Sequence, residues 1–331
     1  MKRLISVLVS ATILLLIYWK IDFAGLIQVF QQSDRLWMVI SLGMVMPLTM
    51  ITAWRLQQLM PKSILPHPPI ASAQQPISLT FAEANRLILA ASTLNMVLPS
   101  KMGDIVKAYF MQDRGHLTGS MALSLVVFEK TCDMLSLLLW CVFGLLLYPQ
   151  KDLLFWVMTV GVTIGFILGL AILSLPKFAT SFFRLMQSIA PKLLKAKLGK
   201  MSYAWQEMHD YFWRDKRHLL KIALTSILIW FLHLLQIWFF ILALNAYVPF
   251  LTNLALSPLA ILAGLLPLTF AGVGTRDAAL ILFYQPYFSA TTAAALGVLC
   301  TSRYFLPAIG GLPFLQQYLA LAKGLKRAKT N

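Results

Sequence analysis

The sequence has few charged residues and few side chains that could carry out catalysis. Asp, Glu, Lys and Arg together supply 12% of the 331 residues, whereas hydrophobic residues supply 59%. Soluble globular domains carry about 25% charged residues, so this composition excludes a soluble globular protein. We therefore expect an integral membrane protein whose long apolar runs leave no room for a soluble catalytic domain.

Cysteine and histidine are also scarce. The chain has three cysteines and five histidines, and none of them shows the spacing of metal ligands. Cys132, Cys141 and Cys300 all fall inside apolar runs, which is typical of inert packing residues. The sequence contains no nucleotide-binding motif and no catalytic triad. We therefore expect neither a metal nor a cofactor, and the residues alone give little support to an enzyme.

Acidic residues are much rarer than basic ones. Twelve Asp and Glu stand against 28 Lys and Arg, which gives a formal net charge of +16. In a soluble protein this balance would indicate nucleic acid. Here most basic residues flank apolar runs, where they orient the chain and attract anionic lipid headgroups. We expect membrane lipids, and not nucleic acid, as the binding partner.

The apolar runs predict an all-α polytopic membrane protein that forms one membrane domain over residues 1–331. Two regions, 82–117 and 254–286, are interrupted by proline and glycine, and we interpret them as re-entrant helical hairpins. The basic, aromatic-rich segment 177–221 is typical of amphipathic helices on an anionic cytoplasmic leaflet, and a basic tail occupies 313–331. Six full transmembrane helices are expected at 4–19, 36–54, 119–148, 153–175, 219–246 and 290–312.

The distribution of lysine and arginine predicts the orientation. With the N-terminus inside, only Lys20, Arg35 and Lys151 lie outside, as the positive-inside rule requires. Both termini are then cytoplasmic, and the expected location is the cytoplasmic membrane. The layout also gives two pseudo-repeats, 1–148 and 153–312, each with two spans, a hairpin and a span. Because each repeat has an odd number of crossings, the second is inverted, and the hairpin tips are expected to meet near the midplane.

The two interrupted segments carry the expected binding residues. In the first break, a helix that restarts near Gly103 would point its amides at a phosphate held by Lys101 and Lys107. In the second break, glycines permit close backbone approach, and Arg276 supplies a planar phosphate donor. The complete set of expected substrate-binding residues is Asn95, Lys101, Asp104, Lys107, Gly272, Gly274, Arg276 and Asp277.

Ionisable residues within the spans indicate a second functional group. Glu129, Lys130 and Asp133 lie about ten residues into the third span, where charges are costly unless they are paired, hydrated or functional. Glu129 and Asp133 share a helix face and repel each other unless a cation stands between them. We predict that Arg303 supplies this cation and that the four residues form a charge relay or gate. A buried ion pair that only fixes helix packing is the alternative. Arg55 is interpreted as an interface anchor, which leaves open that it faces the same cavity.

These residues resemble the motifs of a known family. The pattern Asn95-x-x-x-Pro99-x-x-x-Gly103-Asp104-x-x-Lys107 is followed by Glu129-Lys130-x-x-Asp133, Ala271-Gly272-Val273-Gly274-x-Arg276-Asp277 and Arg303 with Gly310-Gly311. The ordered set is similar to the lysylphosphatidylglycerol synthase transmembrane-region family, also called flippase-like domain proteins. Asp104 and Asp277 stand where the family tends to have Glu, Lys107 where it tends to have Arg, and Ala271 where it often has Gly.

The resemblance implies the lipid-translocating part of such proteins without the soluble aminoacyl-transferase domain. The implied cargo is a membrane lipid, either an anionic or aminoacylated phospholipid, a polyprenyl-phosphate-linked sugar or a hopanoid-type lipid. Two other functions stay open. One is a membrane-embedded transferase that uses Glu129 or Asp133 as a general base. The other is a non-catalytic subunit that docks a lipid synthase or glycosyltransferase through residues 177–221.

Overall fold

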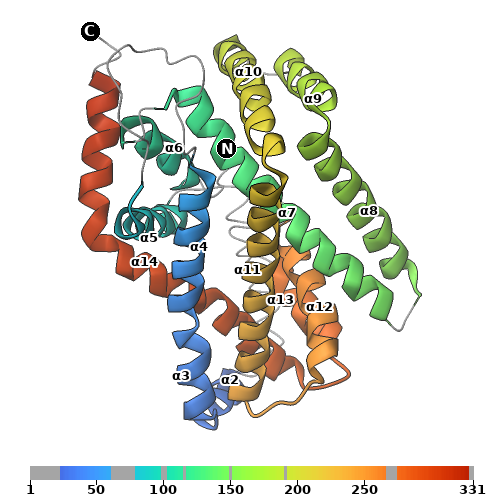
Figure 1. Cartoon of the computed structure of the whole chain (residues 1–331). Coiled ribbons are helices and arrows are strands. Elements are labelled where there is room, and N and C mark those ends of the chain that lie inside the picture. Colours follow the sequence, from blue (N-terminus) through green and yellow to red (C-terminus); the bar gives the residue numbers. More distant parts are fainter. Residues whose placement is uncertain are drawn as a thin grey trace.

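The protein is a bundle of α-helices, shown by a computed structural model that describes residues 23–60, 79–97, 103–114, 117–148, 151–189, 192–265 and 274–327 (Figure 1). Within those ranges all regular secondary structure is helical. The helices are α2 (Phe23–Gln31), α3 (Arg35–Gly43), α4 (Val45–Leu59), α5 (Phe81–Val97), α6 (Gly103–Arg114), α7 (Gly119–Leu147), α8 (Leu153–Ser174), α9 (Pro176–Ile189), α10 (Lys192–Arg214), α11 (Lys216–Ala243), α12 (Phe250–Gly264), α13 (Thr275–Tyr284) and α14 (Ala290–Arg327).

Five helical stretches in the described part of the chain are long and apolar enough to cross a membrane. They are Arg35–Leu59, Gly119–Leu147, Leu153–Ser174, Lys216–Ala243 and Ala290–Gln316. Each one overlaps a span predicted from the sequence, so the protein is an all-α, multi-pass membrane protein. The sixth predicted span, 4–19, lies outside the described residues.

Local side-chain caps fix where several spans begin. The Thr118 hydroxyl accepts a hydrogen bond from the Met121 amide at the start of α7. The Asp152 carboxylate does the same for α8, accepting from the Phe155 amide at 2.8 Å. Such caps satisfy amides that have no partner inside the helix and contribute about 1 kcal/mol each.

The second span differs in detail from the prediction. The expected single helix over 36–54 is divided into α3 and α4 at Met44, and α4 continues to Leu59. This extension adds one turn beyond the predicted end. As a result, Arg55 lies within the helix instead of at its end.

The two interrupted regions each form a pair of packed helices. α5 contacts α6, and α12 contacts α13. The connecting residues 98–102 and 266–273 lie outside the described residues, and with them the predicted meeting of the two hairpin tips. The helices on either side of each break match the predicted hairpin boundaries within a few residues.

The first helix of each pair packs against the last span of the other predicted repeat. α12 lies along α7, and a Cβ on Gly144 of α7 would come within 2.2 Å of the Ala255 carbonyl oxygen of α12. α5 lies along α14, and a Cβ on Gly311 of α14 would come within 2.1 Å of the Leu89 carbonyl oxygen of α5. Only glycine permits backbones to approach this closely.

The last helix is longer than predicted and is bent. α14 runs to Arg327 and so includes most of the predicted basic tail, 313–331. Figure 1 shows a clear change in the direction of this helix. Pro307 and Pro313 lie inside it. Each proline removes one helical hydrogen bond and its ring pushes on the preceding turn, which bends the helix.

The segment 177–221 forms α9, α10 and the start of α11, as the amphipathic pattern predicts. α9 buries Ala179 and Phe183, and the Phe183 ring lies 5.6 Å from that of Trp205 on α10. The opposite side of α9 exposes Leu185 and Ile189. Its position on a membrane leaflet stays a prediction.

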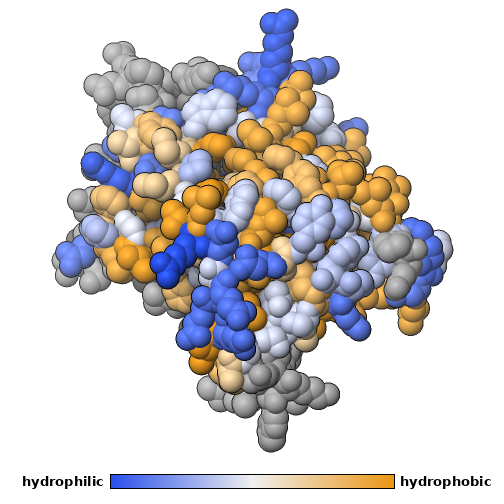
Figure 2. Space-filling model, turned by 90° about the horizontal axis from the view of Figure 1, so that it is seen from below, coloured by the Kyte–Doolittle hydropathy of each residue, from blue (hydrophilic) through white to orange (hydrophobic). Residues whose placement is uncertain are grey.

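Apolar side chains fill the bundle and also cover much of its outside. Among the described residues, the core forms two hydrophobic clusters, one centred on α7 and α11 to α14 and the other on α4 to α7 with α9 and α10. The end view in Figure 2 shows hydrophobic residues over much of the surface with hydrophilic patches between them. Along the side of the bundle, α8 exposes Trp156, Val160, Ile164 and Ile167, and an apolar outer side of this kind is what contact with lipid requires.

Candidate functional site

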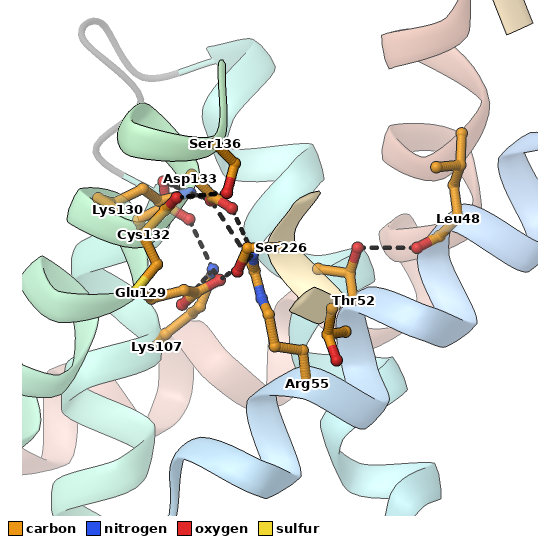
Figure 3. A network of polar contacts seen from close by, with 12 residues as sticks. Leu48, Thr52, Arg55, Lys107, Glu129, Lys130, Cys132, Asp133, Ser136 and Ser226 are labelled. Carbon is orange, nitrogen blue, oxygen red and sulfur yellow. Dashed lines mark hydrogen bonds and ion pairs between the residues drawn. The ribbon is translucent and has the colours of Figure 1, made fainter. Parts of the chain in front are cut away.

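The candidate site is a buried network of ion pairs between α4, α6, α7 and α11. Arg55 of α4 lies at its centre, with a side chain that is 2% exposed. Its Nη2 donates to Glu129 Oε1 at 3.1 Å and to Asp133 Oδ2 at 3.2 Å, while Nη1 donates to the other Asp133 oxygen. Nη1 also donates to Ser226 Oγ of α11 at 2.9 Å. Figure 3 shows the Arg55 side chain reaching from α4 toward both acids.

Lys107 of α6 holds the second position in the network. Its Nζ lies 2.9 Å from Asp104 Oδ1 and donates to both Glu129 oxygens at 3.1 and 3.2 Å. Lys107 and Glu129 are almost fully buried. Glu129 therefore receives hydrogen bonds from two cations on two different helices, and burial makes each of these bonds strong.

Lys130 completes the network on its more open side. Its Nζ lies 3.1 Å from Asp104 Oδ2 and 3.7 Å from Asp133 Oδ2, and its side chain is 45% exposed. The network thus contains three cations, Arg55, Lys107 and Lys130, and three acids, Asp104, Glu129 and Asp133. Its formal charges cancel, which reduces the cost of placing six ionisable groups inside a membrane protein.

The helices set the positions of these side chains. Glu129 and Asp133 are four residues apart on α7 and therefore project from one face, as predicted. Asp104 and Lys107, three residues apart at the start of α6, share a face in the same way. A Cβ on Gly103 would lie 2.3 Å from the Ala91 carbonyl oxygen, so the absence of a side chain lets α6 start against α5.

The predicted partner of the acidic pair is wrong. Arg55, and not Arg303, stands between Glu129 and Asp133. Arg303 on α14 is 4% exposed, and its Nη2 donates to the Tyr304 hydroxyl at 3.1 Å. Its Nε and Nη1 have no hydrogen-bond partner in the described part of the chain. Arg55 follows Trp54 at the end of an apolar run, which made it look like an interface residue in the sequence.

A second polar cluster surrounds the start of α13. Arg276 and Asp277 form a buried ion pair with Nη2 and Oδ1 2.7 Å apart. Arg276 also donates to the Gly297 carbonyl at 3.0 Å and to Thr301 Oγ1 at 2.6 Å, both on α14. Asp277 accepts from the Gly274 amide at 3.0 Å and so caps the helix. Gly274 has φ of 103°, a conformation that favours glycine.

The structure therefore divides the predicted binding residues into two groups. Asp104 and Lys107 join the charge network on α7, whereas Gly274, Arg276 and Asp277 lie together at the start of α13, where Arg276 bonds to α14. Asn95 lies beside the start of α6, because a Cβ on Gly103 would be 2.7 Å from Asn95 Oδ1. The remaining two, Lys101 and Gly272, lie outside the described residues.

Sequence reasoning missed the central role of Arg55 and the part played by Ser226. An arginine in the last turn of a predicted span does not by itself indicate a partner 74 residues later. The sequence did indicate that such a cation must exist, because the two acids on one face of α7 would repel each other without a positive charge between them. Within the described ranges, no group of three or more His, Cys, Asp or Glu residues is placed to hold a metal ion.

Comparison with known proteins supplies the family. A search of the curated proteins found no match. A comparison with protein families matches residues 3–311, nearly the whole chain, to the Lysylphosphatidylglycerol synthase TM region. The matched range includes the helices that carry the charge network and the Arg276 cluster. The chain therefore belongs to the family of the lysylphosphatidylglycerol synthase TM region.

Proposed function

We propose that the protein is a flippase-like lipid transporter that moves an anionic or aminoacylated lipid, or a polyprenyl-type lipid, across the cytoplasmic membrane. The family ties the chain to membrane lipids. The observation that carries the proposal is the charge-neutral network of six ionisable residues joining α4, α6 and α7. Ionisable groups within membrane spans mark transport pathways more often than they serve packing alone.

The position of the network favours a gate. Glu129 lies ten residues into α7, or about 15 Å from its start at a rise of about 1.5 Å per residue. Ion pairs between separate helices can part and reform as the helices move, and each exchange replaces one cation partner by another. A phosphate that passes Arg55 or Lys107 would compete with Glu129 for the same donors. The network can thus open for an anionic headgroup and close behind it.

The packing of the two hairpins supports an inverted repeat. In the proposed topology, six spans and two re-entrant pairs form two halves of opposite orientation, with both termini in the cytoplasm. Gly144 of α7 meets α12, and Gly311 of α14 meets α5, so each half packs its first hairpin helix on the last span of the other. This reciprocal contact is the expected result of pseudo-two-fold symmetry, and rocking of the halves would expose the site alternately.

The amphipathic pair α9 and α10 would lie at the cytoplasmic surface. α9 places Lys177 and Arg184 beside exposed apolar residues, a combination suited to an anionic leaflet. α8 leads directly into α9, so a leaflet contact would continue from the apolar outer side of α8. In this arrangement α9 and α10 hold the protein at the cytoplasmic leaflet, from which a lipid would reach the charge network.

The direct test is lipid movement in proteoliposomes. Purified full-length protein is reconstituted with a fluorescent phosphatidylglycerol, and a membrane-impermeant quencher measures how quickly the lipid changes leaflet. We expect faster exchange than in protein-free vesicles and slower exchange for Glu129→Gln. The control is Arg217→Gln, which removes an exposed charge on α11. Exchange equal to that of empty vesicles would contradict the proposal.

A second measurement separates transport from chemistry. The mass of the lipid is compared before and after incubation with the protein. A transporter leaves the mass unchanged while the lipid moves between leaflets. A changed mass would indicate the transferase alternative, in which Glu129 or Asp133 acts as a general base. Both acids already accept hydrogen bonds from Arg55, which favours a role in the ion-pair network over a role as a base.

A further inference from the structure

The two buried clusters differ in their charge balance. The network around Arg55 has three cations and three acids. The cluster at α13 and α14 has two buried arginines, Arg276 and Arg303, and one buried acid, Asp277. Asp277 pairs with Arg276 at 2.7 Å, so one positive charge in the second cluster has no acid beside it among the described residues.

That uncompensated charge belongs to Arg303. The arginine is 4% exposed, and its one described side-chain hydrogen bond goes to the neutral Tyr304 hydroxyl. The Nε and Nη1 donors have no partner in the described part of the chain. The Arg303 guanidinium also lies 5.0 Å from the centre of the Tyr304 ring, which helps to hold it in place. A buried guanidinium with unused donors attracts an anion strongly.

Both arginines lie at one part of α14, Arg303 as a residue of that helix and Arg276 by reaching to it from α13. Arg276 Nη1 donates to the Cys300 carbonyl at 3.4 Å, and Arg303 follows Cys300 by about one helical turn. The Arg276 guanidinium already donates to Asp277 and to carbonyl groups of α14. It therefore contributes positive potential, but most of its N–H groups are already used. Arg303 is therefore the residue with donors left for a ligand.

We propose that Arg303 is the anchor for the oxyanion of the bound lipid, with Arg276 and Asp277 as a supporting pair. This inference rests on the proposed function and names the point at which its substrate is held. It replaces the expected role of Lys107, whose charge is already taken by Asp104 and Glu129. The recognised chemistry is a phosphate or carboxylate group, and a phosphodiester headgroup meets this requirement.

A lipid anchor that has no acidic partner should not stabilise the protein when lipid is absent. Because Arg303 has no acidic partner among the described residues, replacing it by glutamine removes a buried charge without leaving another one unpaired. Arg303→Gln should therefore unfold at the same temperature as the unmodified protein, or a higher one, when both are stripped of lipid. A large drop in this lipid-free unfolding temperature would show that Arg303 is paired within the protein, which overturns the proposal.

Binding is measured with the full-length protein in a non-ionic detergent. Dioctanoyl phosphatidylglycerol is the probe, and native mass spectrometry with the rise in unfolding temperature reports its binding. We expect Arg303→Gln to weaken binding by about tenfold or more. Arg303→Lys, which keeps the charge, should retain part of it. The matched control Arg217→Gln, on an exposed arginine of α11, should bind as the unmodified protein does.

Two further probes identify the source of the anion. Dioctanoylglycerol has the same acyl chains without phosphate and should not compete. Inorganic phosphate is the second competitor. If the site takes a free oxyanion, phosphate should displace the labelled lipid as effectively as unlabelled lipid does. If the site takes a lipid headgroup, phosphate should displace it much more weakly. Unchanged lipid binding in Arg303→Gln, or equal binding of dioctanoylglycerol, would overturn the anchor. A protein that binds through Arg303 but does not speed leaflet exchange would instead contradict the transport function and leave the anchor standing.

Discussion

Arg55 Nη2 of α4 lies 3.1 Å from Glu129 Oε1 of α7, and both side chains are almost completely buried. The same guanidinium also engages Asp133 and Ser226. One residue therefore connects three helices that are far apart in the sequence.

Arg55→Gln should be strongly destabilising. The change leaves Glu129 with Lys107 alone and Asp133 with only the more exposed Lys130. Loss of one partner from a buried pair costs about 3–5 kcal/mol. The free energy of unfolding in detergent, from a denaturant titration followed by tryptophan fluorescence, measures the effect. Adding Glu129→Gln and Asp133→Asn should restore part of the loss, and no recovery would contradict the pairing.

Lys107 and Lys130 should differ in their effect on stability. Lys107→Met removes a buried cation from two acids and should cost about 3–5 kcal/mol. Lys130→Met removes a cation that is 45% exposed and should cost about 0–1 kcal/mol. The same unfolding titration gives both values. Equal losses would mean that exposure does not govern the strength of these pairs.

Glycine at the two helix crossings should be irreplaceable. Gly311→Ala would place a Cβ 2.1 Å from the Leu89 carbonyl oxygen, and Gly144→Ala would place one 2.2 Å from that of Ala255. The helices must then separate, with an expected loss of about 1–3 kcal/mol. Gly161→Ala on α8 is the matched control, because nothing lies within 4 Å of its added Cβ. The control should be neutral or stabilising by up to about 1 kcal/mol.

Tyr284→Phe should loosen the α12–α13 pair. The Tyr284 hydroxyl donates to Asn253 Oδ1 at 2.9 Å and lies 2.8 Å from Ser257 Oγ, and all three residues are buried. The loss of this hydroxyl should cost about 1–2 kcal/mol. Asn253→Ala should cost more, since its Nδ2 also donates to the Leu234 carbonyl of α11. Hydrogen exchange should then increase in α13 before it increases in α7.

Two exposed tyrosines test the proposed topology. Tyr203 on α10 and Tyr247 after α11 are 78% and 70% exposed, and α11 separates them. With both termini in the cytoplasm, Tyr203→Cys should react with an impermeant thiol reagent only from the cytoplasmic side. Tyr247→Cys should react only from the opposite side. The three native cysteines are buried and should stay unlabelled. Labelling of both positions from one side would exclude α11 as a span.

Much of the helix layout could be predicted from the sequence because lipid imposes a simple rule on length and polarity. The described spans α7, α8 and α11 begin and end within a few residues of their predicted limits. The ends of α4 and α14 were harder to predict. α4 continues past Trp54 and buries Arg55, and α14 continues through Pro313 to Arg327, where packing on α5 overrides the breaking tendency of proline.

Five of the six ionisable residues of the network were among the predicted site residues, but Arg55 was not, and the pairing was not predicted. Glu129 and Asp133 were correctly placed on one helix face, because their spacing alone determines it. Which cation pairs with these two acids depends on which distant helices pack together. Residue spacing within one helix does not determine that packing. In the sequence Arg303 lies inside the last predicted span and Arg55 at the end of the second, so depth favoured Arg303. Both are buried, and only the three-dimensional packing shows which of them meets the acids.

The bend in α14 divides that helix into two arms with different neighbours. The arm before Pro307 receives the Arg276 hydrogen bonds at Gly297 and Thr301, whereas the arm after it holds Thr93 of α5 through the Ala308 carbonyl. Pro307 has no N–H to donate to the Arg303 carbonyl four residues earlier, so one helical hydrogen bond is missing beside Arg303. A change in the angle of α14 at this point would therefore move α5 relative to α13, and Arg303 lies where the two arms of α14 join.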